Sequence, residues 1–377
     1  MNSFPNRGFQ HGTQPGINHL HWLDWLRFTA ALMVVFVHAR GGNWVEWGRL
    51  EEASHTKATA IFFALTRTGA EWVTVFFVLS GFLVGGKVLE RVMAKTFDVR
   101  AYAIDRFSRI WVPLIPSLLF TMGVALYLGR PVSLVDFLGN LIGLQTSFCE
   151  NFGQNVPLWS LAYEIWFYLL AGCVAVIATS RSRTRLWAYL GIAIGFVVFT
   201  RLEVVFLFCW LLGALSYGFR FEQRVGRLAA VGVMMAIAGC VFSQLNSSTV
   251  SVDTSSLKTL VPSREIATLI LSFGLAMIVP LLPRLQPKTV FIKKLDEMGS
   301  RLAAFSYTLY LTHYPLLAIW EKLTPERHFS ISFLTVMLYF IKILSCLVFA
   351  WLLYLPFEAQ TAALRKWLHR RFDAGQC

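Results

Sequence analysis

The chain has 377 residues, of which 56% are hydrophobic and only 15% are charged, and its mean hydropathy is +0.57. A soluble protein of this length would carry about 25% charged residues, so the composition excludes an ordinary soluble domain. The formal net charge of +13 lies in short segments between apolar runs. It forms no basic stripe with interleaved aromatic residues, so we expect no nucleic-acid partner.

Residues 1–18 are rich in Gly, Asn, Gln and Pro and are predicted to be a disordered cytoplasmic tail. Ten apolar runs follow, each suited to crossing a bilayer. The predicted fold is all-α, a polytopic transmembrane bundle of about ten helices within residues 19–357, and residues 358–377 form a basic cytoplasmic tail. The predicted spans are 22–40, 71–89, 107–128, 157–180, 185–200, 204–219, 227–245, 264–283, 300–320 and 331–357.

The loop charges predict that both termini are cytoplasmic. With that orientation, roughly two-thirds of the 34 lysines and arginines lie in inside segments. The apolar stretch 133–148 is too short for an eleventh span, which would also invert the charge bias of every later loop. We therefore interpret it as an interfacial or re-entrant helix on the outer side.

Six cysteines, none of them in a C-x-x-C motif, are interpreted as small core hydrophobes. We expect neither disulfides nor a metal site. A cleavable signal peptide is not expected, because Arg27 lies inside the first apolar run and no small-residue cleavage site follows.

The first predicted span, HLHWLDWLRFTAALMVVFVHAR, contains Asp24, Arg27 and His38. Ionisable groups inside membrane spans are costly and are therefore functional candidates. Arg27 and His38 are eleven residues apart, which places them on one helix face, separated by about 16 Å along the axis. The alternative is a structural pair of Asp24 and Arg27, with His38 simply at the interface.

Two further spans carry ionisable groups at a similar predicted depth. Glu164 lies about 10 Å below the outer surface in PLWSLAYEIWFYLL, and Ser160 lies one turn above it. His313 lies near the outer end of SYTLYLTHYPLL. A carboxylate and two imidazoles, with His38, suit deprotonation of an acceptor hydroxyl. The alternative is three polar groups that only serve helix packing.

On the cytoplasmic side, Arg106 and Arg109 are neighbours on the third helix. Together with Arg27 they could bind the phosphates of a nucleotide-bearing donor. The alternative is ordinary anchoring by inside-facing positive charge. In FFVLSGFLVGG, Ser80 and Gly81 permit close backbone approach, either between helices or to a ligand.

Five motifs, in order, resemble those of the acyltransferase 3 family of integral membrane acyltransferases, from about Leu20 to Phe357. They are LDWLRFTAALMVVFVH, FFVLSGFLVGG, DRFSRIWVPLIP, PLWSLAYEIWFYL and SYTLYLTHYPLL. The resemblance implies a ten-helix domain that transfers acetyl or other short acyl groups from cytoplasmic acyl-coenzyme A to hydroxyls of exported saccharides. It also implies an enzyme of the bacterial inner membrane.

The resemblance implies roles for individual residues. Arg27 and His38 match the arginine and histidine that are essential in the first helix of the family. Glu164 and His313 match the acidic residue and the second histidine of two later family motifs. Arg106 and Arg109 match the basic pair that opens the third helix in the family. Asp24, Ser80, Gly81, Ser160 and Tyr310 are expected to support the site.

The sequence departs from the family pattern in two ways. The first motif usually has glycine where this chain has Trp25, and often where it has Phe28, so helix packing there is expected to differ. Some members carry a soluble esterase-like domain after the tenth helix. This chain is expected to act without one, or with a separate partner.

Donor and acceptor would occupy opposite sides of the membrane. His38 is then either the general base or a nucleophile that accepts the acyl group. Acyl-coenzyme A is expected as a co-substrate, with no bound cofactor. Expected partners are a saccharide or lipid-linked saccharide, membrane lipids and polysaccharide-biosynthesis proteins. The alternatives are a flippase for a lipid-linked saccharide, whose path the charged face would line, and a non-enzymatic scaffold.

Overall fold

The computed structural model describes residues 21–180, 183–219, 225–246, 261–284 and 289–373. Within these residues the chain forms helices joined by turns, and the β pairing is limited to two isolated bridges. The predicted all-α class is therefore confirmed. The predicted tail at residues 1–18 lies outside the described residues.

The principal helices are α1 (His21–Gly41), α3 (Gly69–Ser80), α4 (Gly86–Met93), α5 (Val99–Tyr127), α7 (Trp159–Thr179), α8 (Thr184–Phe199), α9 (Val205–Ser216), α10 (Val225–Leu245), α11 (Arg264–Ile278), α13 (Ser306–Leu323) and α14 (Phe333–Tyr354). The remaining α-helices are α2 (Lys57–Leu65), α6 (Leu134–Leu141), α12 (Val290–Ala304) and α15 (Thr361–Asp373). Short turns complete the path, namely η1 (Trp47–Arg49), η2 (Glu52–Ser54), η4 (Phe152–Gln154), η5 (Val156–Leu158), η6 (Val279–Arg284) and η7 (Glu358–Gln360). A π-helical segment, η3 (Gly81–Gly85), continues α3 into α4.

Seven helical segments of the described chain are long and apolar enough to cross a bilayer. They are Trp22–Gly41, Gly69–Met93, Val99–Tyr127, Val156–Thr179, Val225–Leu245, Arg264–Pro283 and Phe333–Arg371. The protein is therefore a multi-pass membrane protein. The other three predicted spans coincide with α8 and α9, which are shorter, and with α13, which carries more polar residues. The total of ten spans stays a prediction.

Three boundaries differ from the sequence prediction. Helix α5 begins at Val99 rather than 107, because the side chain of Asp98 accepts hydrogen bonds from the first-turn amides of Arg100 and Ala101. The span predicted at 300–320 is broken at Phe305, so residues 300–304 belong to the polar helix α12. The stretch 133–148 contains only the eight-residue helix α6, followed by turns.

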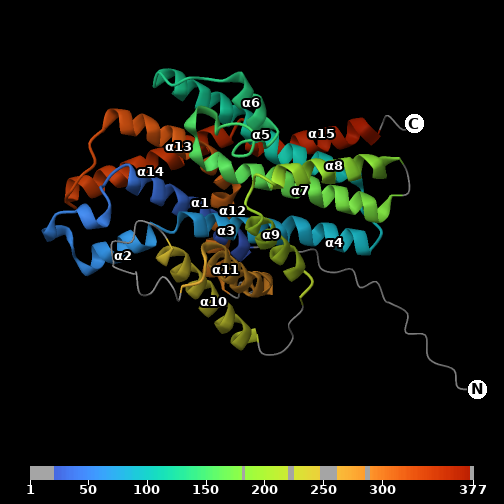
Figure 1. The fold of residues 1–377 in the computed structure, drawn as a ribbon, viewed down its shortest axis with the longest axis horizontal. Helices are drawn as coiled ribbons and strands as arrows, with labels where there is room; N and C mark the ends of the chain where they lie inside the picture. Colours follow the sequence, from blue (N-terminus) through green and yellow to red (C-terminus); the bar gives the residue numbers. More distant parts are fainter. Residues whose placement is uncertain (1–20, 181–182, 220–224, 247–260, 285–288, 374–377) are drawn as a thin grey trace, which may run out of the picture.

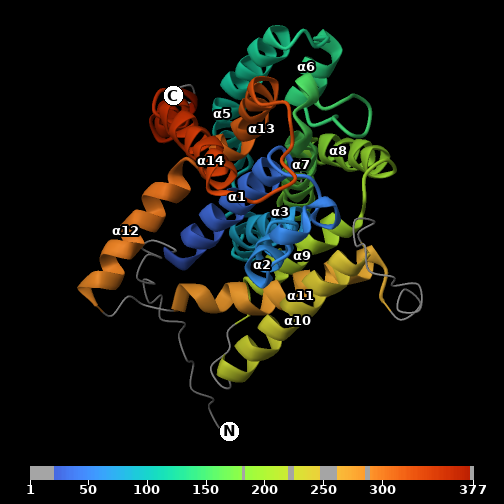
Figure 2. The same ribbon diagram turned by 90° about the vertical axis from the view of Figure 1, so that its left-hand side faces the viewer.

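Helices α1 and α3 lie near the centre of the bundle (Figure 2). Helices α5, α7, α9, α11, α13 and α14 are arranged around them, and α10 packs on the outer side of α11. Helix α15 runs along α5, so residues 361–373 of the segment predicted to be a tail are helical and packed (Figure 1). This arrangement places α1, α5, α7, α13 and the C-terminal segment next to one another.

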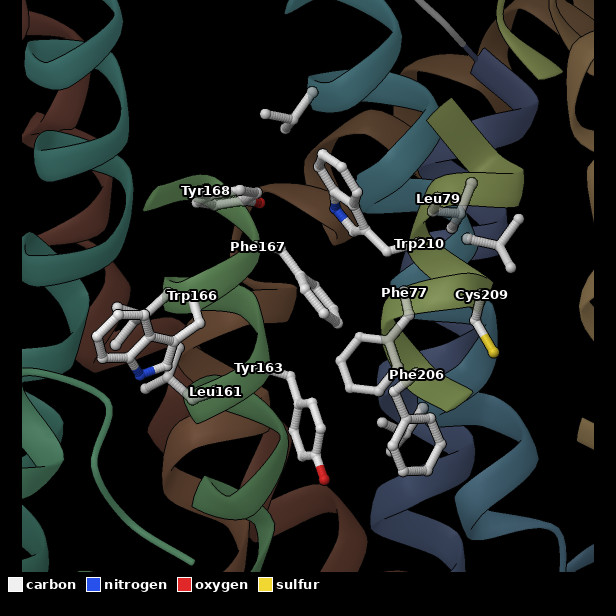
Figure 3. Close-up of a cluster of buried hydrophobic side chains, with 14 of the residues drawn as sticks. Phe77, Leu79, Leu161, Tyr163, Trp166, Phe167, Tyr168, Phe206, Cys209 and Trp210 are labelled. Carbon is white, nitrogen blue, oxygen red and sulfur yellow. The ribbon is translucent and has the colours of Figure 1, made fainter. Parts of the chain in front are cut away.

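The larger core cluster joins α3, α7 and α9 through aromatic side chains (Figure 3). Phe77 of α3 lies against Tyr163 and Phe167 of α7 and against Phe206 of α9, with ring centroids 5.2–5.7 Å apart. Such aromatic contacts add to the free energy gained by burial. They fix the position of α7, which carries Glu164.

Topology can be tested with reporter fusions. We expect a C-terminal alkaline phosphatase fusion to be inactive and a C-terminal green fluorescent protein fusion to fluoresce, because the charge bias predicts that both termini are cytoplasmic. A fusion after Arg130, in a predicted outside loop, is the control and should show phosphatase activity. An active C-terminal phosphatase fusion would contradict the predicted orientation.

Candidate active site

A cavity of about 520 Å³ lies between α1, α3, α5, α7, α13 and the start of α15. Its size is in the range of sites that bind small molecules and cofactors. Arg27, Arg106 and Arg109, the three predicted donor-binding residues, all line it. Helices far apart in the sequence therefore bring these arginines to one place.

Arg27 is fixed at one edge of this cavity. Its guanidinium lies 3.3 Å from the carboxylate of Asp24, and its Nη2 donates a hydrogen bond of 3.2 Å to the carbonyl oxygen of Ala303. The ion pair with Asp24 is the contact that the structural alternative predicted. The buried Nε of Arg27 has no hydrogen-bond partner among the described residues.

Arg109 is held by Glu358, a residue that the sequence analysis did not select. Its Nη1 donates to Glu358 Oε1 at 2.9 Å, and Glu358 Oε2 accepts from the amide and hydroxyl of Thr308, at 3.2 and 2.7 Å. Glu358 is 5% exposed, so a buried carboxylate joins α5, α13 and the C-terminal segment. The sequence does contain an indication of Glu358, because it is the only carboxylate between Glu326 and Asp373.

Arg106 lies over two tyrosine rings, of which Tyr168 also lines the cavity. Its guanidinium carbon is 5.3 Å from the ring centroid of Tyr168 and 5.9 Å from that of Tyr102. These cation–π contacts orient the side chain without using its hydrogen-bond donors. The buried Nε of Arg106 has no hydrogen-bond partner in the described structure.

Four buried donors that line the cavity have no acceptor within the described residues. They are Arg27 Nε, Arg106 Nε and the hydroxyls of Tyr307 and Thr361. A buried donor without an acceptor costs free energy and is uncommon in folded proteins. Their convergence on one cavity indicates a site for a ligand rich in acceptor oxygens.

A chain of hydrogen bonds runs along the wall formed by α3, α7 and α9. Trp210 donates to Ser80 at 3.1 Å, Ser80 donates to Tyr168 at 3.1 Å, and Tyr168 donates to the carboxylate of Glu164 at 2.5 Å. Ser80, Tyr168 and Glu164 line the cavity. The predicted supporting role of Ser80 therefore has a structural basis, since it orients the hydroxyl that contacts Glu164.

Gly81 serves helix packing rather than ligand binding. A Cβ on this residue would collide with the backbone carbonyl oxygen of Trp210 in α9. Gly213 of α9 meets the backbone of Val78 in the same way. The two glycines allow α3 and α9 to pack backbone against backbone.

His38 and His313 lie together, with ring centroids 5.4 Å apart. His313 is fully buried, and its Nδ1 hydrogen-bonds the carbonyl oxygens of Leu309 and Tyr310, at 3.1 and 2.8 Å. Because carbonyls only accept, Nδ1 carries the proton and Nε2 is left as an acceptor. This Nε2 has no partner among the described residues.

His38 is only partly buried, and its ring packs against Tyr314 with centroids 5.1 Å apart. It is therefore the more accessible of the two imidazoles. Neither histidine is among the described residues that line the cavity. Ser160 and Tyr310 do line it, and their hydroxyls are 2.7 Å apart.

The structure thus divides the predicted catalytic group. It brings His38 and His313 together, while Glu164 faces the cavity and contacts Tyr168. Tyr310 connects the two regions, because its hydroxyl meets Ser160 at the cavity and its ring lies 5.9 Å from that of His313. Ser160 and Tyr310 are therefore well placed for their predicted supporting role.

The unusual Trp25 of the first motif is accommodated by α12. Its indole Nε1 donates to the carbonyl oxygen of Leu295 at 3.1 Å, and its ring covers Gly299, where a Cβ would collide with it. Phe28 packs edge-on against Phe305, with ring centroids 6.1 Å apart. The packing expected to differ at these two positions therefore consists of contacts of Trp25 with α12 and of Phe28 with Phe305, at the break before α13.

The cysteines of the described chain are free, and two of them, Cys209 and Cys346, are fully buried. This confirms that these two are small core residues. Cys377 lies outside the described residues.

Comparison with known proteins agrees with the resemblance. Residues 20–355 match the acyltransferase 3 family, described as an acyltransferase domain. A Haemophilus influenzae protein, described only as an uncharacterized protein, is 27% identical over 123 residues, which are 29% of this chain and 50% of that protein. The chain thus matches about half the length of this curated relative. No solved structure matches. Because the family match covers nearly the whole described bundle, the chain belongs to the acyltransferase 3 family of membrane acyltransferases.

Proposed function

We propose that this protein is an O-acyltransferase of the bacterial inner membrane that uses acyl-coenzyme A. It would transfer acetyl or another short acyl group to a hydroxyl of a saccharide, such as an exopolysaccharide, an O-antigen or a lipo-oligosaccharide. The observation that carries the donor assignment is the set of four unpartnered donors, among the described residues, in a cavity lined by four arginines. Phosphate oxygens are suitable acceptors for such a set.

The position of the cavity suits a donor that enters from the cytoplasm. Arg27 and Arg106 lie at the end of α1 and α5 that the charge bias assigns to the cytoplasm, and His38 lies near the other end of α1. With phosphates at the arginines, the thioester end would extend past Ser160 and Tyr310 toward His38. Only the acyl group would then need to cross to the acceptor.

The proposed reaction is a direct transfer with His38 as general base. An imidazole nitrogen of His38 removes the proton of the acceptor hydroxyl, whose oxygen attacks the thioester carbonyl carbon. The carbon–sulfur bond breaks, coenzyme A leaves as the thiolate, and the proton on His38 neutralises it. His313, with its acceptor nitrogen free, would hold the orientation of the protonated His38. The alternative route forms an acyl-histidine on His38 first.

The two substrates proposed for this reaction lie on opposite sides of the membrane. Acyl-coenzyme A is the cytoplasmic co-substrate, and a saccharide or lipid-linked saccharide is the acceptor on the outer side. Membrane lipids surround the bundle, since many apolar side chains on α8, α10 and α14 are exposed. Polysaccharide-biosynthesis proteins would supply the acceptor.

Removal of either donor-site arginine should weaken the use of acetyl-coenzyme A. In membrane vesicles we expect Arg106→Ala or Arg109→Ala to raise the donor Michaelis constant by about tenfold or more, because each loses a charge-assisted contact with phosphate. Arg91→Ala is the matched control, since Arg91 is an exposed cytoplasmic-side cation on α4 that does not line the cavity. An unchanged constant in both variants, at equal protein levels, would reduce these arginines to topology anchors.

A further inference from the structure

The mouth of the donor cavity is formed in part by the C-terminal helix α15. Arg365 of this helix lines the cavity together with Lys87 of α4, and both side chains are exposed. Arg27, Arg106 and Arg109 are more buried members of the same cavity. The basic residues therefore form two groups, one inside the cavity and one at its opening.

Contacts with α5 orient Arg365 at this opening. Its Nη1 lies 3.6 Å from the carboxylate of Asp105, and the Nε2 of His369 lies 3.8 Å from the same carboxylate oxygen. Asp105 itself lines the cavity, so the ion pair holds the guanidinium beside the opening. The arginine side chain is 46% exposed and keeps donors available for a ligand.

Thr361 lies one helical turn before Arg365 and therefore shares its face of α15. Its hydroxyl is buried, lines the cavity and has no partner among the described residues. An unpartnered donor and a cation on one helix face thus line the same cavity. The unpartnered hydroxyl is a second observation, independent of the charge of Arg365, that favours a ligand oxygen at this place.

We propose that Thr361 and Arg365, with Lys87, form a second phosphate-binding site at the mouth of the cavity, and that Arg365 determines donor specificity. The proposal rests on the proposed function. Coenzyme A carries a diphosphate and, farther from its thiol, a 3′-phosphate on the ribose. With the thioester directed inward, the diphosphate reaches the inner arginines and the 3′-phosphate reaches the mouth.

Binding of coenzyme A and of 3′-dephospho-coenzyme A to the purified full-length protein tests this site without an acceptor. We expect the wild type to bind coenzyme A about tenfold more tightly than the dephospho compound, because the 3′-phosphate adds one charge-assisted contact. Arg365→Gln should abolish this preference by weakening only coenzyme A. Arg370→Gln is the matched control, since Arg370 is exposed on the same helix and does not line the cavity.

The possible results separate this proposal from the proposed function. If Arg365→Gln weakens both compounds equally, or neither, α15 does not bind the 3′-phosphate and the proposal is wrong. Arg109→Ala should weaken both compounds, because it acts on the diphosphate. If the wild type binds neither compound, the donor assignment itself fails and the second phosphate site fails with it.

Discussion

Replacement of His38 by glutamine is expected to reduce acyl transfer by a factor of about 10²–10⁴, the usual contribution of general acid–base catalysis. Glutamine keeps the approximate size and the hydrogen-bonding capacity of histidine but cannot take up a proton. His38 is only partly buried and packs on rings rather than on a hydrogen-bond network, so the variant should insert and fold normally. The measurement is transfer of labelled acetyl from acetyl-coenzyme A to membrane glycan in vesicles.

A second histidine provides the control for this substitution. The side chain of His328 lies outside the site, and its backbone forms the bridge to Trp44. His328→Gln should therefore transfer acetyl at the wild-type rate. If His38→Gln also keeps the wild-type rate, His38 is not the base, and the catalytic role passes to Glu164 or His313.

Gly81→Ala is expected to destabilise the folded protein by about 3 kcal/mol or more, at the upper end of what overpacking costs. The added Cβ would meet the carbonyl oxygen of Trp210 and the amide nitrogen of Ala214. These are backbone atoms of α9, which cannot move aside as the end of a side chain can. The unfolding temperature of the purified variant should fall, together with its yield in the membrane.

Gly123→Ala gives the matched comparison, because Gly123 is also helical and a Cβ there has nothing within 4 Å. It should be neutral or stabilising by about 0.5–1 kcal/mol, as alanine favours a helix over glycine. Equal stability of the Gly81 and Gly123 variants would contradict the backbone-to-backbone packing of α3 and α9.

Much of the fold follows from local sequence patterns. Long apolar runs fix the helices, because each run can satisfy its backbone hydrogen bonds only as a helix in the membrane. The contact of Asp24 with Arg27 and the shared face of Ser160 and Glu164 follow from helical spacing. The pairing of His38 with His313 was expected from depth alone, and the structure brings their rings together.

Other features depend on how separate helices are rotated against one another, which spacing along one helix does not determine. The depth of Glu164 groups it with the histidines, but α7 turns it toward the cavity, which neither histidine lines. The contact of Arg109 with Glu358 joins residues 249 positions apart. Helix α15 resembled a tail because it lacks an apolar run, so its place beside α5 was missed.

The central claim is that this membrane protein transfers an acyl group from acyl-coenzyme A to an exported saccharide, using His38. Mass spectrometry of surface glycans tests it most directly, in a deletion strain complemented with wild type or His38→Gln. We expect normal amounts of exported glycan in every strain, with the ester present only when the wild-type protein is supplied. Collapse of glycan export in the deletion strain and in the His38→Gln strain, whatever the ester content, would contradict the account and indicate a flippase.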